Sequence, residues 1–468
     1  MKNFAVTDSD SNIRPMLRLA LPALAEETLV LAVTWTDWFL ASRYFVDEGD
    51  ATKAAMGLVA YLMWLIPSFF SVVAIGATAL IARWVGAGDL NRARLAANQA
   101  LLAGILFVIG LIGISIRTDE LFVGWMQLKG SSANYALEYI RILIPMIPFI
   151  MFSQVGAACL RGAGDTFTGF GVKCIVVVIN IVVSTALVTG WGLFPQFGWK
   201  GIAIGTASGY FVGGAIILAV LFRGRAGIQW KAPLLKPDWE ILRKMFRIGL
   251  PGGFDISVLL FSQLLFLALI NSLGKASAAA HGLAVQIEAC AFLPGAAFQA
   301  AAATIAGQFL GAGRPDRATK GVLLCLFTGG AIMLGSGGML YFFGPNIASF
   351  FTNDPNHPTT IQVAELLKVI AFVMPCLAAV MIISGGFRGA GDTVWPLFFT
   401  VIGFFVLRIP LAVYFAFAVI EIPILEVTFT GWGLGVAGAW YAMAADLVIR
   451  SLMIFWRFRG EGWKKIEI

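Results

Sequence analysis

The chain has 468 residues, of which 59% are apolar and only 13% are charged, and its mean hydropathy is +0.85. This composition excludes a water-soluble globular domain. The net charge of +7 does not indicate nucleic-acid binding, because the Lys and Arg residues are spread over short loops and do not form one stripe.

Apolar runs of about 20 residues, the length that a helix needs to cross a bilayer, follow one another along the chain. They begin near Leu17, Ala54, Ala93, Tyr135, Phe167, Trp199, Ile248, Ala278, Gly321, Val363, Val394 and Trp432. Continuous runs differ from the short alternating segments of a membrane β-barrel. The sequence therefore predicts an all-α membrane protein with twelve transmembrane helices, six in each half.

Basic residues mark every second connection between these helices, as on the cytoplasmic side of a membrane. They are Arg83, Arg92, Arg94, Arg223, Arg225, Lys231, Lys236, Arg243, Lys244, Arg247, Arg314, Arg317, Lys320, Arg457, Arg459, Lys464 and Lys465. The opposite loops are acidic, with Asp47, Glu48, Asp50, Asp119, Glu120, Asp354, Glu421 and Glu426. We expect a multi-pass protein of the plasma (inner) membrane with both termini in the cytoplasm. The five cysteines lie in or beside predicted helices and are expected to be buried thiols.

The two halves repeat one another. Arg161-Gly162-Ala163-Gly164-Asp165-Thr166 recurs unchanged at 388–393, and the phrase at 16–22 recurs in similar form at 245–251. The turn at 86–88 likewise recurs at 311–313. We divide the chain into an amino-terminal lobe (1–225), a cytoplasmic linker (226–244) and a carboxy-terminal lobe (245–468), related by an axis along the membrane normal.

The repeated RGAGDT motif carries an Arg and an Asp in each copy: Arg161 with Asp165, and Arg388 with Asp392. Glycines permit sharp turns and close helix approach, and an Arg beside an Asp can pair locally. We interpret these motifs as structural turns and gate latches, with substrate contact as the alternative.

These motifs resemble those of the multidrug and toxic compound extrusion (MATE) family, and the phrase at 303–318 extends the resemblance to the second half. The resemblance is greatest to its DinF-type branch. It implies an antiporter that exports organic cations and xenobiotics in exchange for H⁺ or Na⁺, by alternating access of a central cavity. It implies no enzymatic activity and no cofactor.

The resemblance also implies an ion-coupling site in the amino-terminal lobe. Its members here are Asp37, Asn180, Ser184 and Thr206, with Pro22 as a hinge. A carboxylate deep in a span is costly unless it faces a cavity or a partner. Asp37, Asn180 and Thr206 could offer oxygens to Na⁺, but Ser184 stands where the branch carries an Asp, so the choice between H⁺ and Na⁺ stays open. A purely structural, hydrogen-bonded Asp37 is the alternative.

Glu26 lies eleven residues before Asp37, on nearly the same helix face, and aligns with Asp255 in the second half. We place Glu26 with the coupling site, and the end of its helix is the alternative position. Glu288, His281 and Asp255 are the candidates for cation recognition in the carboxy-terminal lobe, although a lone histidine is more often structural. Arg408, Lys173 and Asp446 interrupt apolar stretches without an assigned role.

Two other functions compete with this interpretation. A lipid-linked oligosaccharide flippase, or another lipid flippase, would line its cavity with Arg and Lys, whereas the first lobe is mainly acidic. A membrane-embedded enzyme would need clustered metal ligands or a nucleophile with its base, and the chain has only two histidines. We expect lipid and small organic cations as partners, no resident metal, no nucleic acid, and a protein that functions as a monomer.

Overall fold

The computed structural model describes residues 5–6, 12–45, 49–125, 129–192, 194–352, 354–422 and 427–468. The acidic loop residues at 47, 48 and 426 lie outside these ranges. The first half contains α1 (Ile13–Tyr44), α2 (Gly49–Gly86), α3 (Leu90–Trp125), α4 (Ser131–Leu143), α5 (Ile147–Gly162), α6 (Phe167–Thr189) and α7 (Trp199–Arg223). The short 3₁₀ turn η2 (Ile144–Met146) joins α4 to α5 as one membrane span.

The second half repeats this order. It contains α8 (Trp239–Ser272), α9 (Lys275–Gly311), α10 (Pro315–Thr352), α11 (Pro358–Ala390), α12 (Val394–Val401), α13 (Ile409–Ala416) and α14 (Gly435–Arg459). The π-helical stretch η4 (Ile402–Arg408) joins α12 to α13, and the 3₁₀ turns η3 (Ala232–Leu235) and η5 (Glu461–Lys465) flank the half.

Within the described residues, eleven helical spans are long and apolar enough to cross a membrane. α1 is the twelfth: its 32 residues suffice for a crossing, and its lower hydropathy reflects Glu26, Glu27 and Asp37. The predicted twelve-helix, all-α membrane architecture is confirmed. Most spans begin within six residues of the predicted position, and α8 begins nine residues earlier, at Trp239 instead of Ile248.

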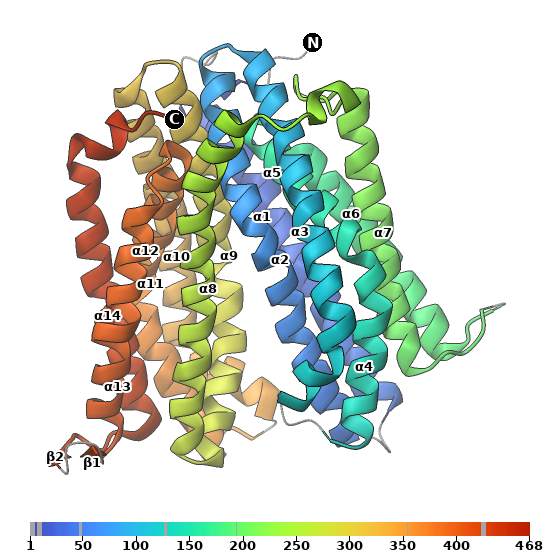
Figure 1. The fold of residues 1–468 in the computed structure, drawn as a ribbon. Coiled ribbons are helices and arrows are strands. Elements are labelled where there is room, and N and C mark those ends of the chain that lie inside the picture. The colour runs from blue at the N-terminus through green and yellow to red at the C-terminus, as the bar shows by residue number, and fades with distance from the viewer. Residues whose placement is uncertain are drawn as a thin grey trace.

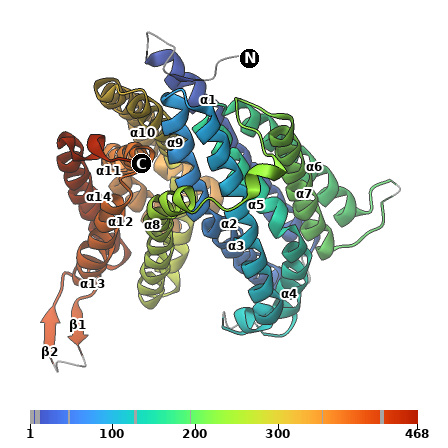
Figure 2. The same cartoon turned by 45° about the horizontal axis from the view of Figure 1, so that its top comes forward.

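A two-stranded antiparallel hairpin, β1 (Val419–Ile422) with β2 (Val427–Thr430), was not predicted from the sequence. It projects from the end of the molecule opposite the chain termini (Figures 1 and 2). We call these two ends the hairpin end and the termini end. α8 begins at Trp239, inside the segment interpreted as linker, and the division into two lobes stays a prediction.

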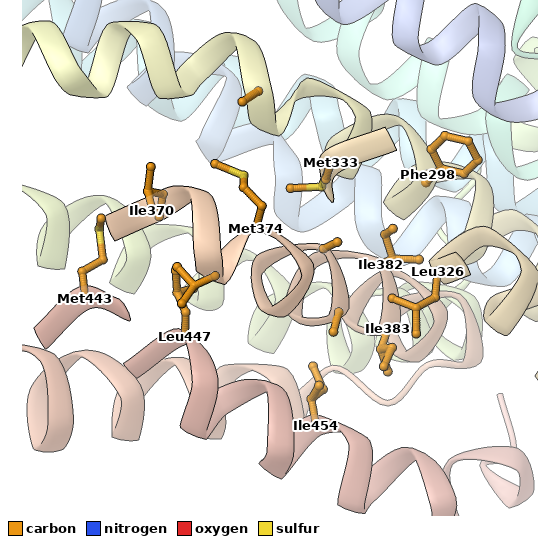
Figure 3. Packing of buried hydrophobic residues seen from close by; sticks show 14 of the residues in the cluster. Phe298, Leu326, Met333, Ile370, Met374, Ile382, Ile383, Met443, Leu447 and Ile454 are labelled. Carbon is orange, nitrogen blue, oxygen red and sulfur yellow. The ribbon is translucent and has the colours of Figure 1, made fainter. Parts of the chain in front are cut away.

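The helices form two bundles, with α2 to α7 in one and α9 to α14 in the other (Figure 1). The second bundle packs around α11, where Ile370, Met374, Ile382 and Ile383 meet side chains of α9, α10 and α14 (Figure 3). Such burial positions rigid helices, because interdigitated side chains resist displacement.

The first helix of each half begins in the core of the opposite bundle. Met16 and Leu19 of α1 are buried in the cluster formed mainly by α9 to α14. Reciprocally, Met245 and Ile248 of α8 are buried among α2, α3 and α5. The two bundles are therefore cross-braced at the termini end, where α1 and α8 start.

At this end the two bundles approach each other closely along a seam that is lined by glycines. A Cβ on Gly86 would overlap the backbone of Gln308, and one on Gly311 would overlap the carbonyl of Arg83. Across the same seam, Thr304 Oγ1 donates to the Arg161 carbonyl (3.1 Å) and Gln308 Nε2 to the Gly162 carbonyl (2.9 Å). Both carbonyls belong to the last turn of α5, where helical i+4 donors are missing, and the Arg161 carbonyl also accepts from Gly164 N (2.9 Å). Toward the hairpin end the ribbons of the two bundles diverge (Figure 1).

We predict that Gly86→Ala weakens the seam, because the added methyl group collides with backbone that cannot rotate away. Overpacking of this kind costs about 1–3 kcal/mol. Thermal unfolding in detergent should show a lower midpoint. Gly57→Ala, in the same helix with open space around its Cα, is the control and should not lower the midpoint. Equal midpoints for both variants would contradict close packing at Gly86.

Candidate functional site

A buried polar cluster links α1 to three helices of the first bundle, namely α4, α6 and α7. Thr206 Oγ1 on α7 donates to Asp37 Oδ2 on α1 (3.0 Å) and accepts from Asn180 Nδ2 on α6 and Tyr139 OH on α4 (both 3.1 Å). All four side chains are buried. The hydroxyl of Thr206 is thus the centre that fixes the others.

Three oxygens of this cluster have no hydrogen-bond partner among the described residues. They are Asp37 Oδ1, Asn180 Oδ1 and Ser184 Oγ. A buried acceptor without a partner costs free energy, so the arrangement leaves room for a proton or a hard cation to supply the missing interaction. Carboxylate, amide and hydroxyl oxygens are ligands that suit a hard cation.

The local sequence brings these groups together. Asn180 and Ser184 stand four residues apart and share a face of α6. Gly205 lies against Ser184, with no room for a Cβ, so α7 approaches α6 closely enough for Thr206 to reach Asn180. Asp37, Asn180, Ser184 and Thr206, which the resemblance grouped, are adjacent in the structure.

Sequence reasoning missed Tyr139. Its ring is buried and tilts against Trp199 at a centroid distance of 6.3 Å, which directs the hydroxyl to Thr206. No motif marked this tyrosine, since its role depends on how α4 packs against α7. Pro22 is buried within α1, and its role as a hinge stays a prediction.

The placement of Glu26 beside Asp37 is corrected by the structure. Glu26 Oε1 lies 3.9 Å from Arg161 Nη1, and its other oxygen is next to Gly169 in the first turn of α6. Gly169 precedes Asn180 by eleven residues, or about 16 Å of helix. Glu26 therefore lies toward the termini end, the alternative position, and pairs with the RGAGDT arginine.

Asp255 occupies the equivalent place in the second half. Its Oδ2 accepts a hydrogen bond of 2.6 Å from Arg388 Nη2, the arginine of the second RGAGDT motif. Asp255 is buried and already neutralised, which argues against its predicted role in recognising an external cation. The repeat has kept an acid and an arginine together in both halves.

The aspartates of the two motifs also have equivalent partners. Asp165 Oδ2 pairs with Arg225 Nε and Asp392 Oδ2 with Arg457 Nη2, each at 2.8 Å, just after or at the end of the sixth helix of its half. Burial raises the pKa of Asp392, while the hydrogen bond and charge of Arg457 oppose this shift. The contacts support a structural latch for both motifs.

In the second bundle, the other two candidates lie on one face of α9. His281 Nδ1 accepts a hydrogen bond of 3.1 Å from Trp440 Nε1, and the ring is buried against Phe266 and Trp440. These contacts match the structural alternative for His281. Glu288 is half-buried and interacts electrostatically with Arg408.

The residues without an assigned role also have partners. Lys173 lies near Glu27. Arg408 and Arg450 both pair with Asp446, at 2.7 and 2.6 Å, in the interior of the second bundle. Among the residues that the structure describes, no group of three or more His, Cys, Asp or Glu side chains is suited to a metal ion.

Comparisons with known families, relatives and solved structures all point to the same family of membrane proteins. The MatE family profile matches residues 22–185 and 251–414, which is more than half of the chain and one copy per half. The probable multidrug resistance protein NorM of Thermotoga maritima is 27% identical over 99% of this chain and 96% of its own length. The probable multidrug resistance protein YoeA of Bacillus subtilis is 26% identical over 90% of this chain and 88% of its own. A crystal structure of MATE in the bent conformation superimposes with a TM-score of 0.86 over 98% of this chain and 97% of that one, at 21% identity.

We predict that Thr206→Val destabilises the fold while Thr206→Ser does not. Valine keeps the shape but leaves Asp37, Asn180 and Tyr139 without their common partner, and each buried unpaired group costs about 1–3 kcal/mol. The midpoint of thermal unfolding in detergent should fall clearly for valine only. Equal loss for serine would assign the effect to the methyl group and contradict a central role of the hydroxyl.

The two latch pairs should differ in strength. Asp255→Asn breaks a short buried ion pair and is expected to cost about 3–5 kcal/mol. Glu26→Gln weakens a longer, partly exposed pair and should cost about 0–1 kcal/mol. Chemical unfolding of both variants beside the unsubstituted protein measures the difference, and a larger loss for Glu26→Gln would contradict it.

Proposed function

The chain belongs to the MatE family, and we propose that it is a secondary antiporter that exports organic cations in exchange for H⁺ or Na⁺ bound at the Asp37 cluster. The observation that carries the proposal is the set of three unpartnered oxygens around Asp37. No other carboxylate in the described bundles combines burial with a free oxygen of this kind. On this proposal the protein is a transporter and not an enzyme.

The coupling follows from charge. An ionised Asp37 in a buried site attracts a cation, and a bound H⁺ or Na⁺ removes this attraction. An organic cation and the coupling ion therefore cannot both be held well at once. Binding of one from one side promotes release of the other, which is the requirement for exchange.

The arrangement of the bundles indicates to which side of the membrane this state of the protein is closed. Arg83, Arg161, Arg388 and Arg457 all lie at the termini end, as expected for the cytoplasmic side of a plasma-membrane protein. The seam is closed at this end by Gln308 and Thr304. We infer a state closed to the cytoplasm, from which Asp37 takes up its coupling ion on the opposite side.

A lipid flippase remains the alternative within the wider superfamily. Recognition of an anionic headgroup would require unpaired basic side chains facing the path. In the described structure, however, Arg161, Arg388, Arg408 and Arg450 are each engaged by a carboxylate. These pairs favour cationic cargo.

The test is efflux of a fluorescent organic cation from proteoliposomes under an imposed pH gradient or, separately, a sodium gradient. We expect one of the two gradients to drive transport and Asp37→Asn to reduce that transport to the level of protein-free liposomes, because asparagine keeps the shape but not the charge. Asp89→Asn, at an exposed turn, is the control and should transport normally.

Two results would reject the proposal. Gradient-driven transport that survives Asp37→Asn would exclude the cluster as the coupling site. Movement of a fluorescent lipid, with no cation transport under either gradient, would favour the flippase.

A further inference from the structure

The second bundle contains a charge cluster that the proposed function does not use. Arg408 from η4 and Arg450 from α14 both donate to Asp446, at distances of 2.6–2.9 Å, and all three side chains are buried. The Arg408 guanidinium also lies over the rings of Phe404 (4.2 Å) and Phe266 (5.8 Å). A buried arginine in a membrane protein is energetically costly, and such residues usually have a functional role.

Glu288 belongs to the same cluster. α9 and α14 both run from the hairpin end to the termini end, and His281 is bonded to Trp440 near their starts. Glu288 follows His281 by seven residues and Asp446 follows Trp440 by six, so the two acids lie at about the same depth, roughly 10 Å further along. This geometry agrees with the electrostatic interaction of Glu288 and Arg408.

The internal repeat makes this cluster the counterpart of the Asp37 site. α8 repeats α1 with a displacement of 229 residues, as Pro22 and Pro251 show, so that Phe266 stands where α1 has Asp37. The RGAGDT motifs are displaced by 227 residues, which aligns Asn180 with Leu407.

The π-helical stretch shifts this last alignment. A π-helical turn takes up an extra residue, which brings Arg408 into the place opposite Asn180. Phe266 and Arg408 are indeed in contact, as Asp37 and Asn180 are both bonded to Thr206.

The other two members fit the same correspondence. α9 repeats α2 with a displacement of 225 residues, which aligns Glu288 with Met63. The glycine pair at 198 and 201 of the sixth span recurs at 435 and 438, which aligns Tyr210 with Leu447, the neighbour of Asp446. Met63 and Tyr210 are in contact, with 4.0 Å between Sδ and the hydroxyl. Phe266, Arg408 and Glu288 thus lie at the counterparts of Asp37, Asn180 and Met63, and Asp446 lies one residue from the counterpart of Tyr210.

The charges of the cluster balance only as a group. Arg450 holds Asp446 through two hydrogen bonds of 2.6 Å. Arg408 adds a further positive charge, and Glu288 is the acid at the same depth that balances it. Where the first bundle has a carboxylate with a free oxygen, the second has a carboxylate with a guanidinium beside it.

We propose that Arg408 is a tethered cation in the carboxy-terminal counterpart of the Asp37 site, where it neutralises Glu288 and leaves the amino-terminal lobe as the only place for an exchangeable cation. This proposal rests on the proposed function, because it takes the Asp37 cluster as the coupling site. It makes Arg408 a residue that determines where coupling takes place. Glu288, the remaining candidate for cation recognition in this lobe, is then unavailable to an external cation.

The test is labelling by dicyclohexylcarbodiimide, an apolar reagent that adds to protonated carboxyl groups and not to a carboxylate paired with a cation. The purified protein is labelled in lipid nanodiscs at neutral pH, and the adducts are located by peptide mass spectrometry. We expect label on Asp37 and at least about tenfold less on Glu288. A difference of one pKa unit between two carboxyl groups changes the ratio of protonated to ionised form about tenfold.

The variants then assign the difference to the charge. Arg408→Gln should raise the labelling of Glu288 about tenfold, whereas Arg408→Lys should leave it low. The size-exclusion profile and the midpoint of thermal unfolding of each variant report whether it keeps its fold. Glu288→Gln combined with Arg408→Gln restores neutrality, and the new label should be absent from the peptide.

Equal labelling of Asp37 and Glu288 in the unsubstituted protein would overturn the proposal without any variant. An unchanged Glu288 signal in a folded Arg408→Gln protein would overturn it as well. If Glu288 responds to Arg408→Gln while Asp37 is never labelled, the tethered cation stands and Asp37 is not protonated at neutral pH. The transport assay of Asp37→Asn then decides separately whether Asp37 is the coupling site. The two proposals are therefore tested separately.

Discussion

Every charge in the membrane interior of this protein must be neutralised by another group of the protein, because no water is available to solvate it. The structure meets this requirement nearly everywhere by pairing. Asp255 has Arg388, Asp446 has two arginines, and Glu26 lies near Arg161. Asp37 differs, since hydrogen bonding occupies one of its oxygens and leaves the other free. The position of this exception defines the candidate site.

Comparison of the two halves shows where the need to neutralise buried charges has preserved the same residues in both copies. At the termini end, both copies retain an acid on the first helix, an arginine and an aspartate in the RGAGDT motif, and an arginine at the end of the sixth helix. Deeper in the membrane the copies differ. Phe266 replaces Asp37, and a guanidinium takes the place of an amide. The contacts at the termini end are therefore shared by the two halves, whereas the polar groups deeper in the membrane differ between them.

The lengths of the apolar runs were enough to predict the helices, and the family resemblance was enough to group the residues around Asp37. It misplaced Glu26, since helical periodicity gives the face of a residue but not which end of the bundle its neighbours occupy. The end of the bundle at which Glu26 lies is set by Arg161, near the end of α5. The spacing of residues within α1 carries no information about this partner. Tyr139 and the partners of Arg408 were missed for the same reason. Their roles follow from contacts between helices that are distant in the sequence.

The seam at the termini end must open if Asp37 is to reach the cytoplasm. Its described contacts between bundles include two hydrogen bonds from Thr304 and Gln308, each worth about 1 kcal/mol. Close glycine packing and the buried side chains at the starts of α1 and α8 add to these. Reversal of a two-state equilibrium from 1:99 to 99:1 needs about 5.5 kcal/mol. Neutralising one buried carboxylate supplies energies of this order. The close backbone contacts at Gly86 and Gly311 must separate in this transition. On the proposed mechanism, the free energy of ion binding at Asp37 therefore has to exceed the free energy that holds this seam together.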